Sequence, residues 1–175
     1  MEAMRYRDGT RVRLIGGRLA LDFANTADWT VDNAVKHEKL NQWGDVEVWA
    51  RAAGIEEALK PEPLNDLLAL RAYVRGVFIR PKGTEPDIQA VNRLLAEIDP
   101  FARSKFTPRI ALSAVSLLLD PNERSRIRMC SGHDCGWLFV DESPRKNRQW
   151  CAMDICGNRE KARRHYERSR AARKP

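Results

Sequence analysis

Residues 130–159 read CSGHDCGWLFVDESPRKNRQWCAMDICGNR, and this stretch decides how the C-terminal part of the chain folds. It begins with two cysteines that have four residues between them, and the same spacing recurs after a further fifteen residues. Two pairs of thiols on short loops are typical of a four-thiolate site, in which one zinc ion is held tetrahedrally. The sequence therefore predicts one structural zinc ion per chain, and its ligands are Cys130, Cys135, Cys151 and Cys156.

The expected compartment supports a metal over a disulfide. The first residues, MEAMRYRDG, carry charges and no apolar signal core, so we expect no export. In a reducing cytosol this cysteine spacing favours metal binding. An iron–sulfur cluster or a redox pair is an alternative use of the thiols, and His133 is an alternative ligand. If His133 bound the zinc ion, one cysteine would be released and the site would become reactive.

The charge of the chain is concentrated in the same region. The formal net charge is +7. Residues 1–125 contain 18 Lys and Arg and 18 Asp and Glu, whereas residues 126–175 contain 13 and 6, so the whole excess lies with the cysteines. Although a run of charge is often only a solvated face, a cationic surface joined to a metal module favours phosphate binding.

A basic helix is expected after the last cysteine, with Gly157 or Asn158 as its N-cap. Glu160 suits the first turn of such a helix and is spaced to pair with Arg164. Because the helix has no broad apolar stripe, its surface is available to a partner. The residues that we expect to contact nucleic acid are Arg145, Lys146, Arg148, Asn158, Arg159, Lys161, Arg163, Arg164, His165, Arg168 and Arg170.

The remaining sequence predicts an α-rich N-terminal domain with a few short strands. Asp45 is expected to cap the first clear helix, which Gly54 ends, while Pro81 and Pro100 end the next two. Apolar residues recur at helical spacing at residues 45–54, 64–80, 84–99 and 110–119.

The segments before these helices predict less regular structure. Residues 11–24 predict a strand, a Gly16–Gly17 turn and a second apolar element that is either strand or helix. Residues 29–43 predict an irregular segment, because Asn, Asp and Lys are interspersed there. Pro121 marks the domain boundary, and it divides the chain into residues 1–122 and 123–175.

A polar cluster near the N-terminus is a candidate ligand site. Asp22, Asn25 and Thr26 follow the Gly16–Gly17 turn and are expected to line a small site for an effector. The alternative is that these side chains only cap and tie a turn. In either case we expect the N-terminal domain to sense a small molecule or to form a homodimer.

Two parts of the chain resemble known families. The run Cys156-Gly157-Asn158-Arg159, together with the cysteine spacing and the basic residues after it, resembles the CGNR zinc finger, which is named for that run. Residues 16–26, GGRLALDFANT, and the helical region at residues 67–95 resemble the ABATE domain that usually accompanies this finger. ABATE domains occur in bacterial proteins described as stress-induced transcription regulators. The resemblance implies that the four cysteines are metal ligands.

The sequence thus predicts a mostly helical α+β fold, with a small C-terminal treble-like zinc module that ends in a basic helix. We expect a zinc-dependent protein that binds duplex DNA, a bacterial stress-related transcription regulator located in the cytoplasm at the nucleoid. Alternatives are a zinc-stabilised module that docks an acidic protein partner, and an RNA-binding protein. We expect no membrane partner, because no apolar run approaches the length of about 18 residues that a spanning helix needs.

We also expect no enzyme and no catalytic residues. The sequence contains no phosphate loop, nucleophile elbow, metalloprotease helix or Gly-rich dinucleotide turn. Four thiolates on one zinc ion leave no coordination position for a catalytic water.

Overall fold

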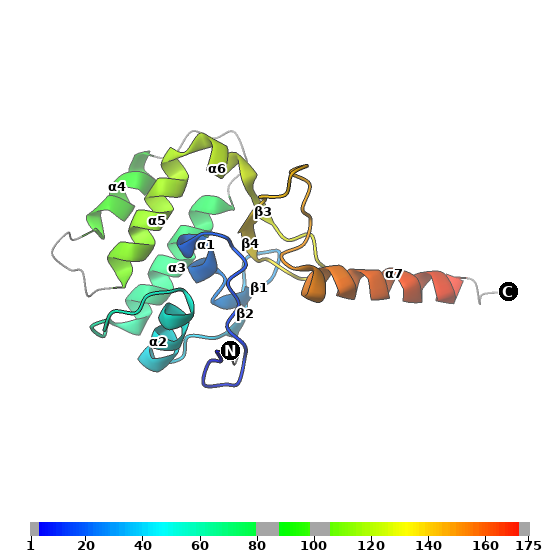
Figure 1. The fold of residues 1–175 in the computed structure, drawn as a ribbon, viewed down its shortest axis with the longest axis horizontal. Coiled ribbons are helices and arrows are strands. Elements are labelled where there is room, and N and C mark those ends of the chain that lie inside the picture. Colours follow the sequence, from blue (N-terminus) through cyan, green and yellow to red (C-terminus); the bar gives the residue numbers. More distant parts are fainter. Residues whose placement is uncertain (1–3, 80–87, 99–105, 172–175) are drawn as a thin grey trace.

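The computed structural model describes residues 4–79, 88–98 and 106–171, and the structural statements below concern these residues (Figure 1). The helices are α1 (Leu19–Ala24), α2 (Trp43–Ala52), α3 (Leu64–Phe78), α4 (Ile88–Ala96), α5 (Thr107–Leu119), α6 (Pro121–Arg126) and α7 (Asn158–Ala171). The strands are β1 (Ala27–Trp29), β2 (Val35–Glu38), β3 (Ile127–Met129) and β4 (Leu138–Val140). A π-helical turn, Met153–Gly157, precedes α7. The predicted fold class, mostly helical α+β, is confirmed.

The elements form a helical body, two small hairpins beside it and one helix that projects from it (Figure 1). Within the body, α1 packs against α3 and α5, and α4 packs against α5. β1 pairs with β2 and β3 pairs with β4, in both cases antiparallel. Because β4 also contacts α1, the second hairpin lies directly on the body.

Three aromatic rings lie at the centre of the core. Phe23, Trp49 and Phe106 meet edge to face with ring centroids 5.2 to 5.7 Å apart, an arrangement that the ring quadrupoles favour. All three side chains are at most 1% exposed. They come from α1, α2 and the residue before α5, so this cluster joins elements that are far apart in the sequence.

The start of α2 differs from the prediction by one turn. Gln42 is the N-cap residue, and Asp45 occupies the third helical position, from which its side chain reaches back to the backbone of the cap. Asp45 also accepts the amide of Asn41 at 3.0 Å and that of Arg7 at 3.1 Å. Asp45 therefore caps the start of this helix, as expected, but it does so from the third helical position of a capping box and not as the N-cap residue. Gly54 ends the helix at φ +79°, as predicted.

The strand predicted within residues 11–24 is wrong. Arg11 forms only an isolated bridge with Arg5, and the second apolar element of this segment is α1. The cause is a buried turn, in which the carboxylate of Asp22 accepts the amide of Gly16 at 2.7 Å and folds the chain back onto the helix. A Cβ atom at Gly16 would lie 2.8 Å from the backbone nitrogen of Asp22, so only glycine fits there.

The prediction of an irregular segment at residues 29–43 is wrong for its first part. β1 and β2 form a hairpin in which Ala27 lies opposite Glu38, with an irregularity in the register at Asp28–Trp29. The connection includes Asn33 at φ 66°, a left-handed conformation that asparagine tolerates. The side chains of β2 are mostly exposed, so this strand lacks the apolar alternation by which a sequence pattern is recognised.

The other predicted helices are present, and some of their expected ends lie outside the described residues. α3 and α5 coincide closely with the predictions, and α4 covers most of its predicted segment. The expected stops at Pro81 and Pro100 are not among the described residues. Pro121, the expected domain boundary, is the first residue of α6, which Asp120 caps by accepting two backbone amides.

The second hairpin joins the cysteine region to the helical body. Ile127, Leu138 and Val140 belong to the same buried cluster as the apolar side chains of α1, α3 and α5. The side chain of Asn25 donates to the carbonyl of Leu138 at 2.8 Å and accepts its amide at 2.9 Å. The division of the chain at residue 122 stays a prediction, and in space the two parts share one core.

The buried turn at Asp22 predicts a specific pH dependence of stability. Burial raises the pKa of Asp22 to about 6, and hydrogen bonds from the backbone amides of residues 15–17 only partly oppose this. Between the unfolded pKa of 3.8 and about 6, the folded chain holds a proton that the unfolded chain has released. The free energy of unfolding contributed by this group therefore falls as the pH rises through that window, by up to about 3 kcal/mol.

An Asp22→Asn variant keeps an oxygen acceptor for the Gly16 amide and lacks this titration. Its free energy of unfolding, minus that of the unmodified protein, should increase as the pH is raised from 4 to 7. Urea unfolding of both proteins at several pH values measures this difference. The titration of all other groups affects both proteins equally and cancels in the difference. A difference that stays constant across this pH range would show that folding does not raise the pKa of Asp22.

Candidate metal centre and cationic helix

The four cysteines converge on one point from three elements. Cys130 follows β3, Cys135 precedes β4, Cys151 lies just before the π-turn and Cys156 lies within it. Their Sγ atoms all lie within 4.8 Å of one another, with 3.9 Å between Cys135 and Cys151 and 3.5 Å between Cys151 and Cys156. In a tetrahedron with zinc–sulfur bonds of about 2.3 Å, neighbouring sulfur atoms are about 3.8 Å apart. The donor atoms and their spacing therefore fit a closed zinc site.

Backbone amides and a close-fitting glycine complete the surroundings of the sulfur atoms. The amides of Gly132 and Cys151 donate to the Sγ atom of Cys130 at 3.3 and 3.2 Å, which stabilises a thiolate there. A Cβ atom at Gly132 would lie 2.9 Å from the Sγ atom of Cys156, so no larger residue fits without a shift. His133 is exposed and lies outside this cluster, and the structure thus gives no support to its replacing a cysteine.

The sulfur atoms are too close together to ionise independently. The pKa of Cys130 is lowered to about 2 because first Cys135 and then Cys151 donate hydrogen bonds to its sulfur. The contact with Cys130 raises the pKa of Cys135 to about 12 and also raises that of Cys151. One thiolate thus keeps its neighbours protonated, and a divalent cation is needed to hold four thiolates at this distance. The four cysteines accordingly form a single zinc site.

The predicted small apolar core around the metal centre is confirmed. Trp137 and Phe139 are buried in the same cluster as the cysteines, and Trp150 packs against it. Trp29 of β1 belongs to this cluster too, and the ring N–H of Trp137 donates to the carbonyl of Ala27 at 3.1 Å. The N-terminal hairpin therefore supplies part of the packing around the metal centre.

The loop after β4 contains three of the predicted nucleic-acid contacts, and one of them has a structural role. The guanidinium of Arg148 lies 4.2 Å from the ring centroid of Phe139 and donates to the carbonyl of Trp150 at 3.0 Å. These contacts hold the loop in place and keep that side chain half-buried. Arg145 and Lys146 of the same loop are exposed.

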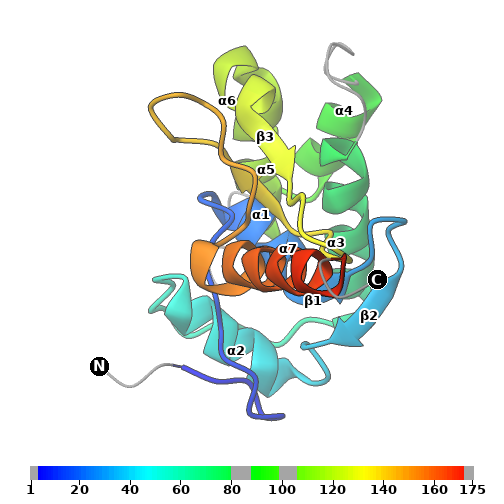
Figure 2. The ribbon, with the colours of Figure 1, turned by 90° about the vertical axis from the view of Figure 1, so that its right-hand side faces the viewer.

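The basic helix α7 leaves the metal centre without a break in helical structure. The N-cap residue of the π-turn is Ala152, and Asn158 already has helical angles, φ −69° and ψ −38°. The prediction that Gly157 or Asn158 caps this helix is therefore wrong, because the chain turns helical four or five residues earlier, at Met153. α7 then runs away from the body, and in Figure 2 it points toward the viewer.

Glu160 of α7 is buried, with 7% of its surface exposed. It accepts hydrogen bonds from Arg163 at 2.6 Å and from Arg164 at 3.2 Å, and Arg163 also donates to Glu167 at 2.5 Å. The predicted pairing of Glu160 with Arg164 is confirmed, and the two arginines, Arg163 first, lower the pKa of Glu160. The predicted contact residues of α7 are all exposed: Asn158, Arg159, Lys161, Arg163, Arg164, His165, Arg168 and Arg170.

The polar cluster proposed as a ligand site is occupied by intramolecular hydrogen bonds. Asp22, Asn25 and Thr26 are 8%, 3% and 1% exposed. Asp22 binds the amide of Gly16, Asn25 binds both backbone groups of Leu138, and Thr26 donates to a carbonyl of α1 at 2.7 Å. The structure gives all three a role in tying turns together, and effector binding by them stays a prediction.

Two buried arginines of α3 were not foreseen as links from the helical body to the metal centre and to the β1–β2 hairpin. Arg75, 1% exposed, donates to the carbonyl of Gly136 at 2.6 Å, and its guanidinium lies 4.4 Å from the ring centroid of Trp29. Burial lowers the pKa of Arg75 to about 10. Arg71, one turn earlier, pairs with Glu38 of β2. The sequence does place the two arginines four residues apart on an otherwise apolar helix face. Charged side chains that are buried on such a face need partners, so this pattern could have indicated the two links.

The fit at Gly132 predicts a mutational effect on zinc affinity. In a Gly132→Ala variant, the new methyl group must displace a zinc ligand, Cys156. We expect zinc affinity to fall about ten- to a hundred-fold, the usual cost of disturbing the surroundings of metal ligands. Competition with a chromophoric chelator measures this change.

Gly76→Ala is the matched control for that experiment, because a Cβ atom at Gly76 in α3 meets nothing within 4 Å. It should leave zinc affinity unchanged, and its stability should rise slightly, by up to about 1 kcal/mol. Equal zinc affinities of the two variants would contradict the assignment of Gly132 to the metal centre.

Comparisons with protein families agree with this geometry. The model of the CGNR zinc finger matches residues 126–169, which include all four cysteines and most of α7. The ABATE model, described as "Putative stress-induced transcription regulator", matches residues 17–121. No curated protein matches the chain. Neither matched family is an enzyme family.

No helix in the described ranges is both long and apolar enough to cross a membrane. The ABATE match spans more than half of the 175 residues. The chain therefore belongs to the ABATE family, and its residues 126–169 match the CGNR zinc finger, whose four cysteines form a single zinc site.

Proposed function

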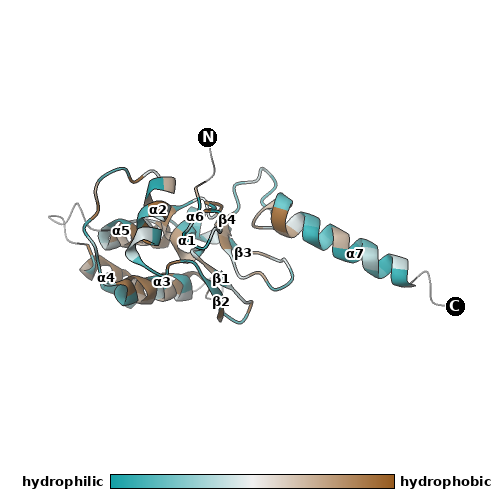
Figure 3. Ribbon diagram, turned by 90° about the horizontal axis from the view of Figure 1, so that it is seen from below, coloured by the Kyte–Doolittle hydropathy of each residue, from teal (hydrophilic) through white to brown (hydrophobic). Residues whose placement is uncertain are grey.

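We propose that this protein is a zinc-dependent transcription regulator that binds duplex DNA through α7. The observation that carries the proposal is the exposed position of a cationic helix that begins at the metal centre (Figure 3). Residues 158–171 contain six Lys and Arg and two Glu. An α-helix about 10–12 Å in diameter fits the major groove, which is about 12 Å wide.

The two glutamates of α7 indicate which side faces the DNA. Glu160 and Glu167 are seven positions apart, about two turns, so they lie on the same side of the helix. Both bind Arg163 there. Carboxylates repel phosphate, and we therefore place the DNA on the opposite side. At 3.6 residues per turn, the opposite stripe consists of Asn158, Ala162, His165 and Ser169.

A row of cations flanks this stripe on each side. Lys161 and Arg168 follow one edge, and Arg159 and Arg170 follow the other, by the same helical spacing. None of these four side chains forms an ion pair with any other residue that the structure describes. The two rows can therefore contact phosphates on both sides of a groove. Phosphate contacts of this kind supply affinity and position the helix.

The stripe between the rows supplies groups that read base edges. The carboxamide of Asn158 can both donate to and accept from an adenine edge, and the imidazole of His165 offers one further polar group. Because both side chains are exposed, neither has to break a buried contact to reach a base. Arg145 and Lys146 on the neighbouring loop add phosphate contacts in this account, whereas Arg148 holds the loop.

The biological setting is part of the same proposal: a bacterial regulator that acts under stress, in the cytoplasm at the nucleoid. The description of the ABATE family as a stress-induced transcription regulator supports the regulatory role. One helix contacts only a few base pairs, so useful specificity calls for a homodimer that reads two half-sites. An effector sensed by the helical body would then control binding.

The exposed cation row predicts a change in salt dependence. Fluorescence anisotropy with random duplex DNA should show affinity falling log-linearly as salt rises. A Lys161→Gln/Arg168→Gln variant removes two phosphate contacts, so the slope should decrease by about 1.8, or 0.9 for each contact. Zinc content should not change, because neither side chain touches the metal centre.

Arg51→Gln/Lys60→Gln is the matched control, since both residues are exposed cations of the helical body. It should leave the salt slope unchanged. If both variants bind DNA like the unmodified protein, α7 is not the DNA contact. If structured RNA or an acidic protein competes more strongly than duplex DNA, the partner is of that class instead.

The stripe predicts where sequence preference resides. After a preferred duplex has been selected from a random pool, an Asn158→Ala variant should lose about tenfold in its preference for that duplex over random DNA. Its affinity for random DNA should stay the same, because the phosphate contacts remain. Ser131→Ala, which alters an exposed residue of the first cysteine loop, is the control. Loss of random-DNA binding without loss of preference would place Asn158 among the phosphate contacts.

A further inference from the structure

A cavity of about 500 Å³ lies where the N-terminal segment, the β1–β2 hairpin and the metal centre meet. Three of the zinc ligands, Cys135, Cys151 and Cys156, form part of its wall. Five cations and two carboxylates also face it, a formal excess of +3 that the adjoining zinc ion with its four thiolates, formally −2, reduces to +1. The cations are Arg11, Arg13, Lys36, Lys39 and Arg159.

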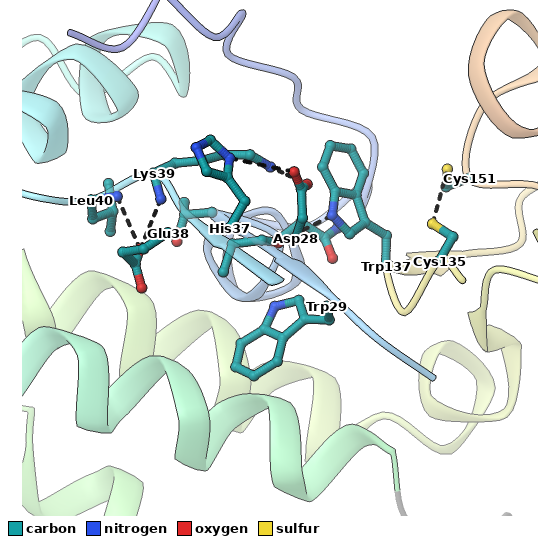
Figure 4. Close-up of polar contacts among 12 residues, drawn as sticks. Asp28, Trp29, His37, Glu38, Lys39, Leu40, Cys135, Trp137 and Cys151 are labelled. Carbon is teal, nitrogen blue, oxygen red and sulfur yellow. Dashed lines mark hydrogen bonds and ion pairs between the residues drawn. The ribbon is translucent and has the colours of Figure 1, made fainter. Parts of the chain in front are cut away.

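Two of the cations are neutralised by the two carboxylates. Lys39 is 3% exposed, its Nζ atom donates to Asp28 at 2.6 Å, and it lies 4.4 Å from the ring centroid of Trp137. Figure 4 shows Asp28 between His37 and Lys39 on one side and the ring of Trp137 on the other. Lys36 pairs with Asp134 at the exposed rim, where the two side chains are 41% and 42% exposed. Each of the two pairs is formally neutral.

Three arginines carry the positive charge that faces the cavity beyond these two pairs. Arg13 has a partner, Asp154, but that carboxylate is 68% exposed and the pair is weak. Arg11 and Arg159 form no side-chain hydrogen bond or ion pair with any other residue in the described ranges. They come from opposite ends of the sequence, and both line this cavity. Guanidinium groups bind carboxylates and phosphates through paired N–H donors.

The rest of the wall consists of the polar residues Thr10 and His37, the zinc ligands and apolar side chains. Trp137 and Ile155 belong to the apolar part, and the ring N–H of Trp137 is already bonded to the carbonyl of Ala27. These side chains therefore offer contact surface but no further polar group. A cavity of this size, with apolar walls and a few convergent charged groups, is typical of small-molecule sites.

We propose that this cavity binds a small organic anion, with its carboxylate or phosphate held by Arg11, Arg13 and Arg159 and its apolar part against Trp137 and Ile155. The site differs from the polar cluster at Asp22, Asn25 and Thr26, and it does not depend on DNA binding. Arg159 lies in the first turn of α7. If the proposed function holds, an occupied cavity removes one phosphate contact and weakens the affinity for DNA.

Calorimetric titration of the zinc-loaded, full-length protein tests the proposal. The probes are benzoate, which joins a carboxylate to a flat apolar ring, benzamide, its uncharged isostere, and inorganic phosphate. Benzoate should bind with one site per chain, at least about tenfold more tightly than benzamide. Competition by phosphate shows that the anionic group is what the site recognises.

An Arg11→Gln/Arg13→Gln variant should weaken benzoate binding at least about tenfold, because it removes two of the three guanidinium groups. Arg5→Gln is the matched control, an exposed arginine of the same segment that does not line the cavity, and it should bind like the unmodified protein. Zinc content and the circular dichroism of each variant confirm that it is folded.

Three results would overturn the proposal. The first is that neither benzoate nor phosphate binds to the zinc-loaded protein. The second is that benzamide binds as well as benzoate, which would make the cavity merely apolar. The third is that the double variant loses DNA affinity while benzoate binding is unchanged, which would assign these arginines to the DNA surface. Failure of DNA binding alone leaves the cavity proposal standing.

Discussion

Four sulfur atoms have to share one coordination sphere, and the C-terminal part of the structure follows from that requirement. The atoms lie within 4.8 Å of one another, a spacing that four thiolates tolerate only around a cation. Gly132 is needed because no side chain fits between the sulfur atoms. The π-turn that carries Cys156 passes directly into α7. The direction of α7 is thus set at the metal centre rather than by its own packing.

The metal centre is in turn anchored on the helical body by buried polar contacts. Arg75 reaches from α3 to the carbonyl of Gly136, beside Cys135. Asn25 of the α1–β1 connection binds both backbone groups of Leu138 in β4. Breaking either contact would leave a buried polar group unpaired, which costs about 1–3 kcal/mol. α7 therefore extends from a fixed base. In the proposed complex with DNA, the helix would lose little conformational freedom when it enters the major groove.

Local spacing made some features predictable, and long-range contacts hid the others. The cysteine ligands were predictable because their pairs repeat within a few residues, and α3 because its apolar positions recur over four turns. The β1–β2 hairpin was missed because its second strand is polar and exposed. The N-cap of α7 was misplaced because a π-turn has no sequence signal that resembles a cap. The role of Arg75 and the cavity beside Arg159 depend on segments that meet only after folding.

The most direct test of the account is DNA binding by the purified protein as zinc is removed and restored. Fluorescence anisotropy with random duplex DNA at low salt should show binding by the zinc-loaded protein. A chelator should abolish that binding, and added zinc should restore it, because the metal centre fixes the start of α7. The same affinity with and without zinc would contradict the claim that the metal centre positions the DNA-binding helix.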